Sequence, residues 1–466
     1  MSSAATVQNN PNEDDSLKSR FKIRTVTCFV TLTPSDFEDL GVEGEGIDKK
    51  IYAAGLTGRW IEQALVDQGY EVQTVRLATN PFAEWLLLPS TSKTMISDGN
   101  ESDETVSTDV VDERLARVDT LLKEMDINFC ALGPAVSTAD VSICPRIVAS
   151  SSRFSCSTCL SANDTRHAQA AAQCILEISQ LGETYSGPHV ENGLGNFRFC
   201  VAAACQDYIP FFPVAKSPTI KGKGNVKDDG TRGNGTDKTI YIKFAVGLEN
   251  GALAHELLTK CGSIQNIAVF SDGMARVIQP IQELCLRSAA ELVVSTADEH
   301  DLEFEFVGID TSLNPSLDSA GSVAAALEAL EEVTRFGGPG TIAAAASITQ
   351  CLQNLPGIQL AGYCGLMLPL CEDARLVELA NSDSLRIPDL LSISHVCGVG
   401  LDTVPIPGDC SVIELSSLLL DVAGVAYRWN KSLSCRVFPV PGKKAGDSTS
   451  FNDSPHMMNS RILPLS

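Results

Sequence analysis

The chain has 466 residues, of which 44% are hydrophobic and 20% charged, shares that are typical of a globular protein with a large core. Its 35 lysines and arginines stand against 58 aspartates and glutamates, and the resulting formal charge of −23 argues against nucleic acid or an anionic membrane as a partner. The 16 cysteines, the polar first twenty residues and the lack of an apolar run of about 20 residues predict a cytoplasmic protein with reduced thiols.

Strand-like and helix-like segments alternate along most of the chain. Residues 1–20 are polar and predict a disordered tail. A strand rich in β-branched residues is expected at Ile23–Leu32, helical periodicity follows at 49–69, and a second strand is expected at Tyr70–Thr79. Four more strands are predicted at Ile127–Gly133, Asn196–Ala204, Thr239–Leu248 and Leu302–Asp310. This alternation predicts a mainly parallel α/β sheet or barrel.

Two polar segments interrupt the alternation and are predicted to be surface insertions. Residues 89–109 and 217–238 are rich in Gly, Ser, Thr and Asp and have no apolar periodicity. Residues 448–466 are similar in character and are expected to form a C-terminal tail. We therefore expect one large domain over residues 21–447.

The carboxyl ends of parallel strands are where α/β folds bind ligands, so polar residues at these ends are candidates. Glu249 and Asn250 follow one predicted strand, and Asp310 and Ser312 follow another. We expect these four to bind substrate, and the two carboxylates together are a speculative site for a divalent ion. Alternatively, Asp310 is only a helix cap and Glu249 only a solvated loop residue.

Basic side chains near other strand ends are candidates for binding an anionic substrate. Arg198, Lys216 and Arg335 are predicted to neutralise its charge. Thr341 stands at the start of an alanine-rich segment, where it is expected to cap a helix whose amino end can receive an anion.

The densest group of reactive side chains lies in "SHVCGVGLDTVPIPGD" at residues 394–409. A short helix is expected to end near Gly398 or Gly400, and the prolines are expected to stiffen the following loop. Asp402 and His395 are predicted to transfer protons, with Asp409 as a second carboxylate and Cys397 as a nucleophile or a hydrogen-bonding neighbour. A carboxylate metal site and a buried cysteine without chemistry remain alternatives.

Several well-known motifs are absent from the sequence. It contains neither a GxxxxGK[ST] phosphate loop nor a GxGxxG motif that opens a helix after a strand, so no nicotinamide cofactor is expected. HExxH, GxSxG and the kinase motifs are missing too.

Many of these strings, in their order and spacing, resemble the domain-of-unknown-function 711 family, also called uncharacterised protein family 0210. The resemblance rests on "IRTVTCFVTLTPSDF", "VQTVRLATNPF", "NFRFCVAAAC", "PFFPVAK", "FAVGLENG", "VGIDTSLNPS", "RFGGPGT", "CGLMLPLCED", "SHVCGVGLDTVPIPGD" and "VFPVPGKKAGD", and it extends over residues 21–447. It implies an α/β barrel of about ten strands that is grouped with the pyruvate formate-lyase-like barrels and holds its site inside. It does not imply radical chemistry, because "CRVFPVPG" departs from the glycyl-radical string: it has Pro439 where that string needs glycine.

Three functions are consistent with these features. The first is an enzyme, a lyase, isomerase or hydrolase, that applies acid–base or cysteine chemistry to a small polar, anionic metabolite. The second is a metabolite sensor that binds without turnover, and the third is an interaction scaffold that uses the two insertions. A small-molecule ligand is expected in the first two cases, and a homo-oligomer is left open.

Overall fold

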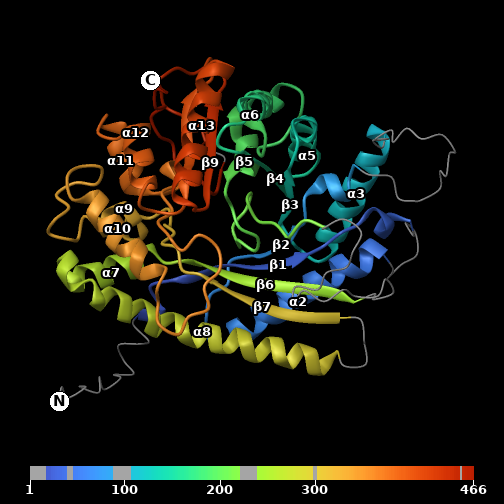
Figure 1. The fold of residues 1–466 in the computed structure, drawn as a ribbon, viewed down its shortest axis with the longest axis horizontal. Coiled ribbons are helices and arrows are strands. Elements are labelled where there is room, and N and C mark those ends of the chain that lie inside the picture. The colour runs from blue at the N-terminus through green and yellow to red at the C-terminus, as the bar shows by residue number, and fades with distance from the viewer. Residues whose placement is uncertain are drawn as a thin grey trace.

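A computed structural model describes residues 17–38, 46–87, 107–220, 239–296, 302–451 and 454–465 (Figure 1). In these residues nine strands form one sheet, in the order β7-β6-β1-β2-β3-β4-β5-β9-β8. The strands are β1 (Lys22–Val30), β2 (Val75–Thr79), β3 (Phe129–Ala135), β4 (Phe154–Cys159), β5 (Phe199–Ala203), β6 (Ile240–Glu249), β7 (Leu302–Asp310), β8 (Gly400–Pro407) and β9 (Leu433–Val440).

The sheet consists of two parallel halves that meet in opposite directions. Strands β1 to β5 run parallel to one another, as do β6 and β7 and, separately, β8 and β9. The halves are antiparallel where β1 meets β6 and where β5 meets β9. Residues 360–369 form parallel bridges from Leu360 to Ile309 of β7, from Leu366 to Leu313 just after β7, and from Pro369 to Asp402 of β8. This segment fills a tenth position between the edge strands, so the sheet closes and the predicted α/β barrel is confirmed.

Helices cover the outside of the barrel (Figure 1). In α2, buried residues such as Ile47, Ile51, Ala54, Ile61 and Leu65 recur every three to seven positions and pack on β1 and β2. None of the helices in the described residues is long and apolar enough to cross a membrane. The helices are α2 (Gly46–Asp67), α3 (Thr108–Glu124), α4 (Thr138–Val141), α5 (Cys144–Ser150), α6 (Thr165–Ser179), α7 (Gly251–Cys261), α8 (Ala268–Ser295), α9 (Val323–Leu327), α10 (Thr341–Leu352), α11 (Ala374–Asn381), α12 (Ile387–Ser394) and α13 (Val412–Trp429).

The loop after β5, residues 204–217, fills much of the barrel interior. Thr27 of β1 donates a hydrogen bond to the Pro210 carbonyl at 2.6 Å, and the Ser217 hydroxyl donates to the Val30 carbonyl at 3.1 Å. Phe211 of this loop packs against β6 at Gly247, where a Cβ atom would lie only 2.5 Å from the phenyl ring. The loop is thus held from several strands, and it narrows the interior to a small cavity.

The six strands predicted from the sequence are present, with ends shifted by a few residues. Strands β4 and β9 were not predicted from the sequence, and the prediction of a loop around Pro405 was wrong because those residues form β8. Two prolines are tolerated there because the strand's carbonyls still accept bonds, as when Leu463 N–H donates to Pro405 O at 3.0 Å.

The ends of the expected domain differ from the prediction in part. Most of both insertions, 88–106 and 221–238, and residues 1–16 of the expected N-terminal tail lie outside the described residues. Residues 448–466 were expected to be a surface tail, yet Phe451, Met457, Ile462 and Leu463 are all at most 5% exposed. This segment is packed because its apolar side chains join the main hydrophobic cluster.

Candidate functional site

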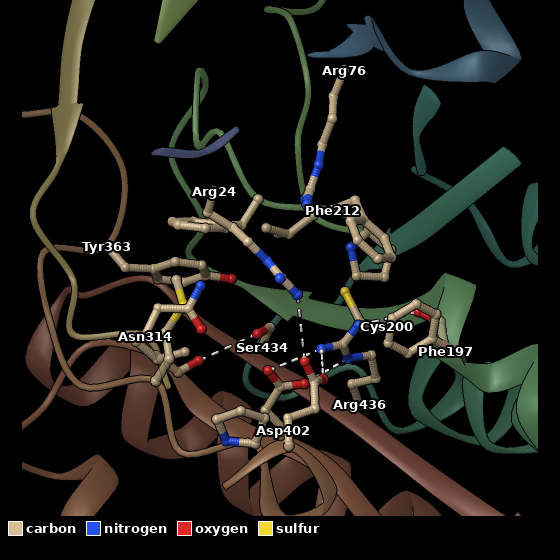
Figure 2. A pocket seen from close by; sticks show the side chains of 17 residues that line it. Arg24, Arg76, Phe197, Cys200, Phe212, Asn314, Tyr363, Asp402, Ser434 and Arg436 are labelled. Carbon is tan, nitrogen blue, oxygen red and sulfur yellow. Dashed lines mark hydrogen bonds and ion pairs between the residues drawn. The ribbon is translucent and has the colours of Figure 1, made fainter. Parts of the chain in front are cut away.

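A cavity inside the barrel brings together five charged side chains (Figure 2). They come from far apart in the sequence: Arg24 from β1, Arg76 from β2, Glu372 from the short helix η7 (Leu370–Glu372), Asp402 from β8 and Arg436 from β9. The cavity offers about 60 Å³ to the centres of water molecules. Its apolar walls include Phe197, Phe211, Phe212, Val214, Met367 and Val399.

Arg436 is the centre of a buried ion-pair network. Its side chain is only 9% exposed, and it contacts Asp402 through two bonds, Nε to Oδ1 at 2.5 Å and Nη2 to Oδ2 at 3.1 Å. Nη2 also donates to Glu372 Oε1 at 3.2 Å. Such a bidentate, charge-assisted pair fixes the orientation of both groups.

Arg24 connects this network to a third carboxylate. Its Nη1 donates to Glu249 Oε2 at 2.9 Å and to Gln73 Oε1 at 2.9 Å, while its Nη2 lies 3.9 Å from Glu372 Oε2. Glu372 is therefore placed between two guanidinium groups, those of Arg24 and Arg436.

Arg76 differs from the other two arginines because it pairs with no carboxylate among the described residues. It is 4% exposed, and its Nε donates to Thr74 Oγ1 at 2.9 Å. Its guanidinium is stacked near two phenyl rings, 4.9 Å from the Phe129 centroid and 4.8 Å from the Phe212 centroid. Burial, together with the charges of Arg24 and Arg436, lowers its pKa well below the usual value. A buried cation of this kind is a binding group for an anion.

Irregular backbone places two of the charged groups. The register of β1 shifts between Ile23 and Thr25, which flank Arg24, and that of β8 shifts between Leu401 and Val404, which flank Asp402. Thr403 has φ +43°, a left-handed conformation that β-branched residues rarely adopt. Bulges of this kind redirect side chains, and such strain is concentrated at functional sites.

Glu372 is the group in the cavity best suited to exchange a proton near neutral pH. Burial is the main cause that raises its pKa, to about 7, and the charge of Asp402 adds to it, while Arg436 and Arg24 act in the opposite direction. A carboxyl group with a pKa near the working pH is able both to donate and to accept a proton.

His456, from the packed C-terminal segment, lies beside the cavity. Its ring stacks on Phe197 with centroids 5.5 Å apart and planes 3° apart. Burial and then the charges of Arg24, Arg198, Arg76 and Arg436 lower its pKa to about 4. The imidazole is therefore neutral at pH 7, and the positive charges of four arginines all influence this side of the cavity.

Of the four residues predicted to be catalytic, only Asp402 lines the cavity. His395 caps the end of α12, where it is exposed and its Nδ1 lies 3.0 Å from Leu391 O. Asp409 is exposed after β8. Cys397 is 1% exposed and donates to Leu366 O, and burial raises the pKa of its thiol, which disfavours a thiolate nucleophile.

Among the predicted substrate-binding residues, Glu249 lies next to the cavity through its pair with Arg24, whereas Asp310 is used internally. Asp310 accepts four hydrogen bonds, from Ser312 N, Ser312 Oγ, Tyr363 N and Cys364 N, at 2.6 to 3.1 Å. Gly362 makes this possible, because a Cβ atom there would lie 2.1 Å from Asp310 Oδ2. Ser312 thus shares a structural network with Asp310.

The other predicted binding residues are distributed around the fold. Asn250 bonds Ser312 O at 3.1 Å and Asn314 N at 2.9 Å, and Thr341 is a buried first residue of α10 that follows the N-cap Gly340. Arg198 donates to Ser152 O at 2.7 Å, and burial lowers its pKa to about 10. Lys216 pairs with Asp207, and Arg335 is exposed.

The speculative metal pair of Glu249 and Asp310 is not supported by the donors. Glu249 is bonded to Arg24 and Gln73, and Asp310 to its four hydrogen-bond donors. In the part of the chain that the structure describes, no three His, Cys, Asp or Glu side chains form a group that could hold an ion.

Four of the residues in this cavity were not predicted from the sequence to be site residues: Arg24, Arg76, Glu372 and Arg436. One signal was present: Arg24, Arg76 and Arg436 each stand inside an apolar, β-branched strand, in "KIRTV", "TVRLA" and "SCRVF". Because an arginine is rarely buried without a polar partner, an arginine inside a buried strand indicates a polar cavity.

Comparison with known proteins gives a family model that matches most of the chain and relatives that match about a third of it. A sequence model described as "Uncharacterised ACR (DUF711)" matches residues 17–453. The chain is similar to a UPF0210 protein of Methanosarcina barkeri (34% identical over 168 residues), one of Limosilactobacillus reuteri (34% over 162) and one of Thermoanaerobacter sp. (33% over 166). These alignments cover 35%, 34% and 35% of this chain and 36% of each relative, so the chain spans about a third of the length of these curated relatives.

Proposed function

Because the chain belongs to the uncharacterised DUF711 family, whose description names no activity, we propose a function from the cavity: an acid–base enzyme that acts on a small anionic metabolite. In this proposal Arg76 binds the anionic group of the metabolite. Glu372 exchanges the proton, and Arg436 with Asp402 holds Glu372 in place. The reaction class stays within the lyases, isomerases and hydrolases.

The observation that carries this proposal is the unpaired charge of Arg76. A guanidinium that is 4% exposed and has no carboxylate partner among the described residues destabilises the empty protein, because burial removes its hydration. An anionic ligand at Arg76 would supply the missing counter-charge. Binding of the anion would therefore raise the free energy of unfolding of the protein.

The proton-exchange step is supported by the position of Glu372. It lies in the same cavity as Arg76, and its pKa of about 7 lets it take up or release a proton at neutral pH. The thiol of Cys200, which also lines the cavity, is a weaker candidate because burial raises its pKa well above the usual value.

A metabolite sensor is the second candidate, and one observation favours it. Both carboxylates that line the cavity, Glu372 and Asp402, already contact Arg436, so neither is free to act without losing an ion pair. A protein that binds the anion and stops there would keep these pairs intact.

The test is a thermal-shift titration of the full chain with inorganic phosphate, sulfate and small carboxylates, followed by mass spectrometry of every acid that stabilises it. We expect an anion-dependent rise in melting temperature that Arg76→Met removes. Arg114→Met is the matched control, because Arg114 is also buried and lies 4.9 Å from a phenyl ring, that of Phe37, but outside the cavity. Consumption of the acid supports an enzyme, binding without consumption supports a sensor, and equal shifts in Arg76→Met and wild type refute the anion site.

A further inference from the structure

The cavity has a second polar end that its ion pairs do not use. It is formed by Asn314, which follows β7, and Tyr363, in the segment that fills the tenth barrel position. In Figure 2 these two side chains lie on one side of the Arg24 guanidinium, and Arg76 and Phe212 lie on the other.

The backbone of Asn314 is fixed, but its side-chain amide is left without a partner. Both backbone groups of Asn314 are already hydrogen-bonded. Asn314 N–H donates to Asn250 Oδ1 at 2.9 Å, and Asn314 O accepts from the Asn250 and Gly251 amides at 3.1 Å. The residue is 7% exposed, and its side-chain amide makes no hydrogen bond to the described residues. A primary amide offers two donors and an acceptor, so one that lines the cavity without a partner among the described residues is a recognition group for a polar ligand.

Tyr363 adds a hydroxyl to the same end. Its backbone is held by Asp310 at 2.8 Å, its ring is 6% exposed, and its hydroxyl has a long contact of 4.0 Å to Cys205 Sγ. Burial raises its pKa well above the usual value, so the phenol keeps its proton at neutral pH and can donate it in a hydrogen bond.

The size of the cavity limits what can join the two ends. The space open to the centres of water molecules is only about 60 Å³, which favours a small ligand over a sugar phosphate or a nucleotide. Apolar side chains such as Met367 and Val399 stand between the polar groups and suit a short carbon chain.

We propose that the ligand is a small carboxylate of about three carbons that carries a hydroxyl or oxo group, and that Asn314 selects this group. The proposal rests on the proposed function, because Arg76 binds the carboxylate end. Asn314 and Tyr363 then bond the neutral oxygen, which a plain aliphatic acid lacks. A site that must satisfy buried polar groups rejects an analogue without the matching oxygen.

The experiment measures the affinities of propanoate, lactate and pyruvate for the full chain by isothermal titration calorimetry, with inorganic phosphate as a fourth probe. In wild type, lactate or pyruvate is expected to bind about five-fold or more tightly than propanoate, the effect of one hydrogen bond of ordinary strength. Asn314→Leu, which is close in size, removes one of the two groups that bond the oxygen, so it should lower this ratio clearly while propanoate binding is still detected. Propanoate thus serves as an internal check that the variant is folded.

Thr349→Val is the control, since Thr349 Oγ1 makes no hydrogen bond either but is buried on α10 outside the lining of the cavity. It should keep the wild-type ratio. A ratio of one in wild type, or an unchanged ratio in Asn314→Leu, overturns this inference while Arg76-dependent propanoate binding leaves the proposed function standing. If no acid binds but phosphate binds through Arg76, only this inference fails, and if no anion binds at all, both fail.

Discussion

Replacing Asp402 by asparagine tests the buried ion pair on which the cavity depends. The substitution keeps the size of the side chain but removes the charge that holds Arg436 through bonds of 2.5 and 3.1 Å. Removal of one partner from a buried ion pair costs about 3–5 kcal/mol. Because Glu372 still contacts Arg436 at 3.2 Å, we expect the lower end, about 3 kcal/mol at pH 6.

The cost should become smaller as the pH rises. In the wild type, Glu372 has a pKa of about 7, partly because Asp402 repels its charged form. Its raised pKa gives stability that is complete below about pH 4.5 and lost as the pH rises through 7. Asp402→Asn removes that repulsion and lowers the pKa of Glu372, so the variant loses less stability over this range. The difference between the two proteins is therefore larger at pH 6 than at pH 8.5.

The assay is urea unfolding at pH 6 and 8.5, followed by far-UV circular dichroism. If the chain unfolds as one unit, an unfolding entropy of about 2.1 cal/mol/K per residue over 466 residues turns 3 kcal/mol into roughly 3 °C of melting temperature. Asp409→Asn is the matched control, because Asp409 is exposed at the end of the same strand and should change stability by less than about 0.5 kcal/mol. Equal, small losses in both variants, or a loss that grows with pH, would refute the reasoning.

Three further outcomes are expected. The free energy of unfolding of Glu372→Gln should rise relative to that of the wild type as the pH goes from 4 to 8, by at most about 3 kcal/mol. The reason is that only the wild type has a carboxyl group whose pKa is raised from 4.5 to about 7, so only the wild type is destabilised when this group ionises. Parallel pH profiles of the two proteins in urea unfolding would contradict this. Ile462→Ala should lose about 2–5 kcal/mol, as a fully buried core residue does, and exposed Pro464 should tolerate alanine; similar melting temperatures would show that the C-terminal segment does not pack. Iodoacetamide should leave buried Cys397 unmodified in the native protein and react first with half-buried thiols such as Cys351 and Cys410, and mass mapping in the reverse order would contradict burial of Cys397.

The fold was more accessible from sequence than the site. Strands such as Leu302–Asp310 are predicted by β-branched and aromatic residues between turn signals, and the helices are predicted by apolar periodicity. Strand β8 was not predicted because Pro405 and Pro407 normally argue against a strand. The prolines are tolerated because β8 lies beside residues 360–369, which fill the tenth barrel position.

The site was harder to predict because its residues meet only after the barrel closes. Asp402 and Arg436 are separated by 34 positions, and Arg24 and Glu249 by 225. Local spacing favoured His395 and Cys397 as partners of Asp402, but a helix end directs His395 to solvent and Cys397 to the core. Local density of reactive residues was therefore a poor guide, whereas a charge inside an apolar strand was a good one.

The strings that carry the family resemblance contribute residues that line the cavity, which favours the cavity over the exposed polar groups as the candidate site. "IRTVTC" contributes Arg24, "VQTVRLA" Arg76, "VGIDTSLNPS" Asn314 and "CGLMLPLCED" Glu372. "SHVCGVGLDTVPIPGD" contributes Asp402, the one predicted catalytic residue that lines the cavity. These strings lie on separate strands and loops, and four of the five residues that they place in the cavity are charged. Packing alone would be satisfied by apolar side chains at these positions, so the presence of three arginines and two carboxylates in the cavity supports the proposed binding of an anionic ligand.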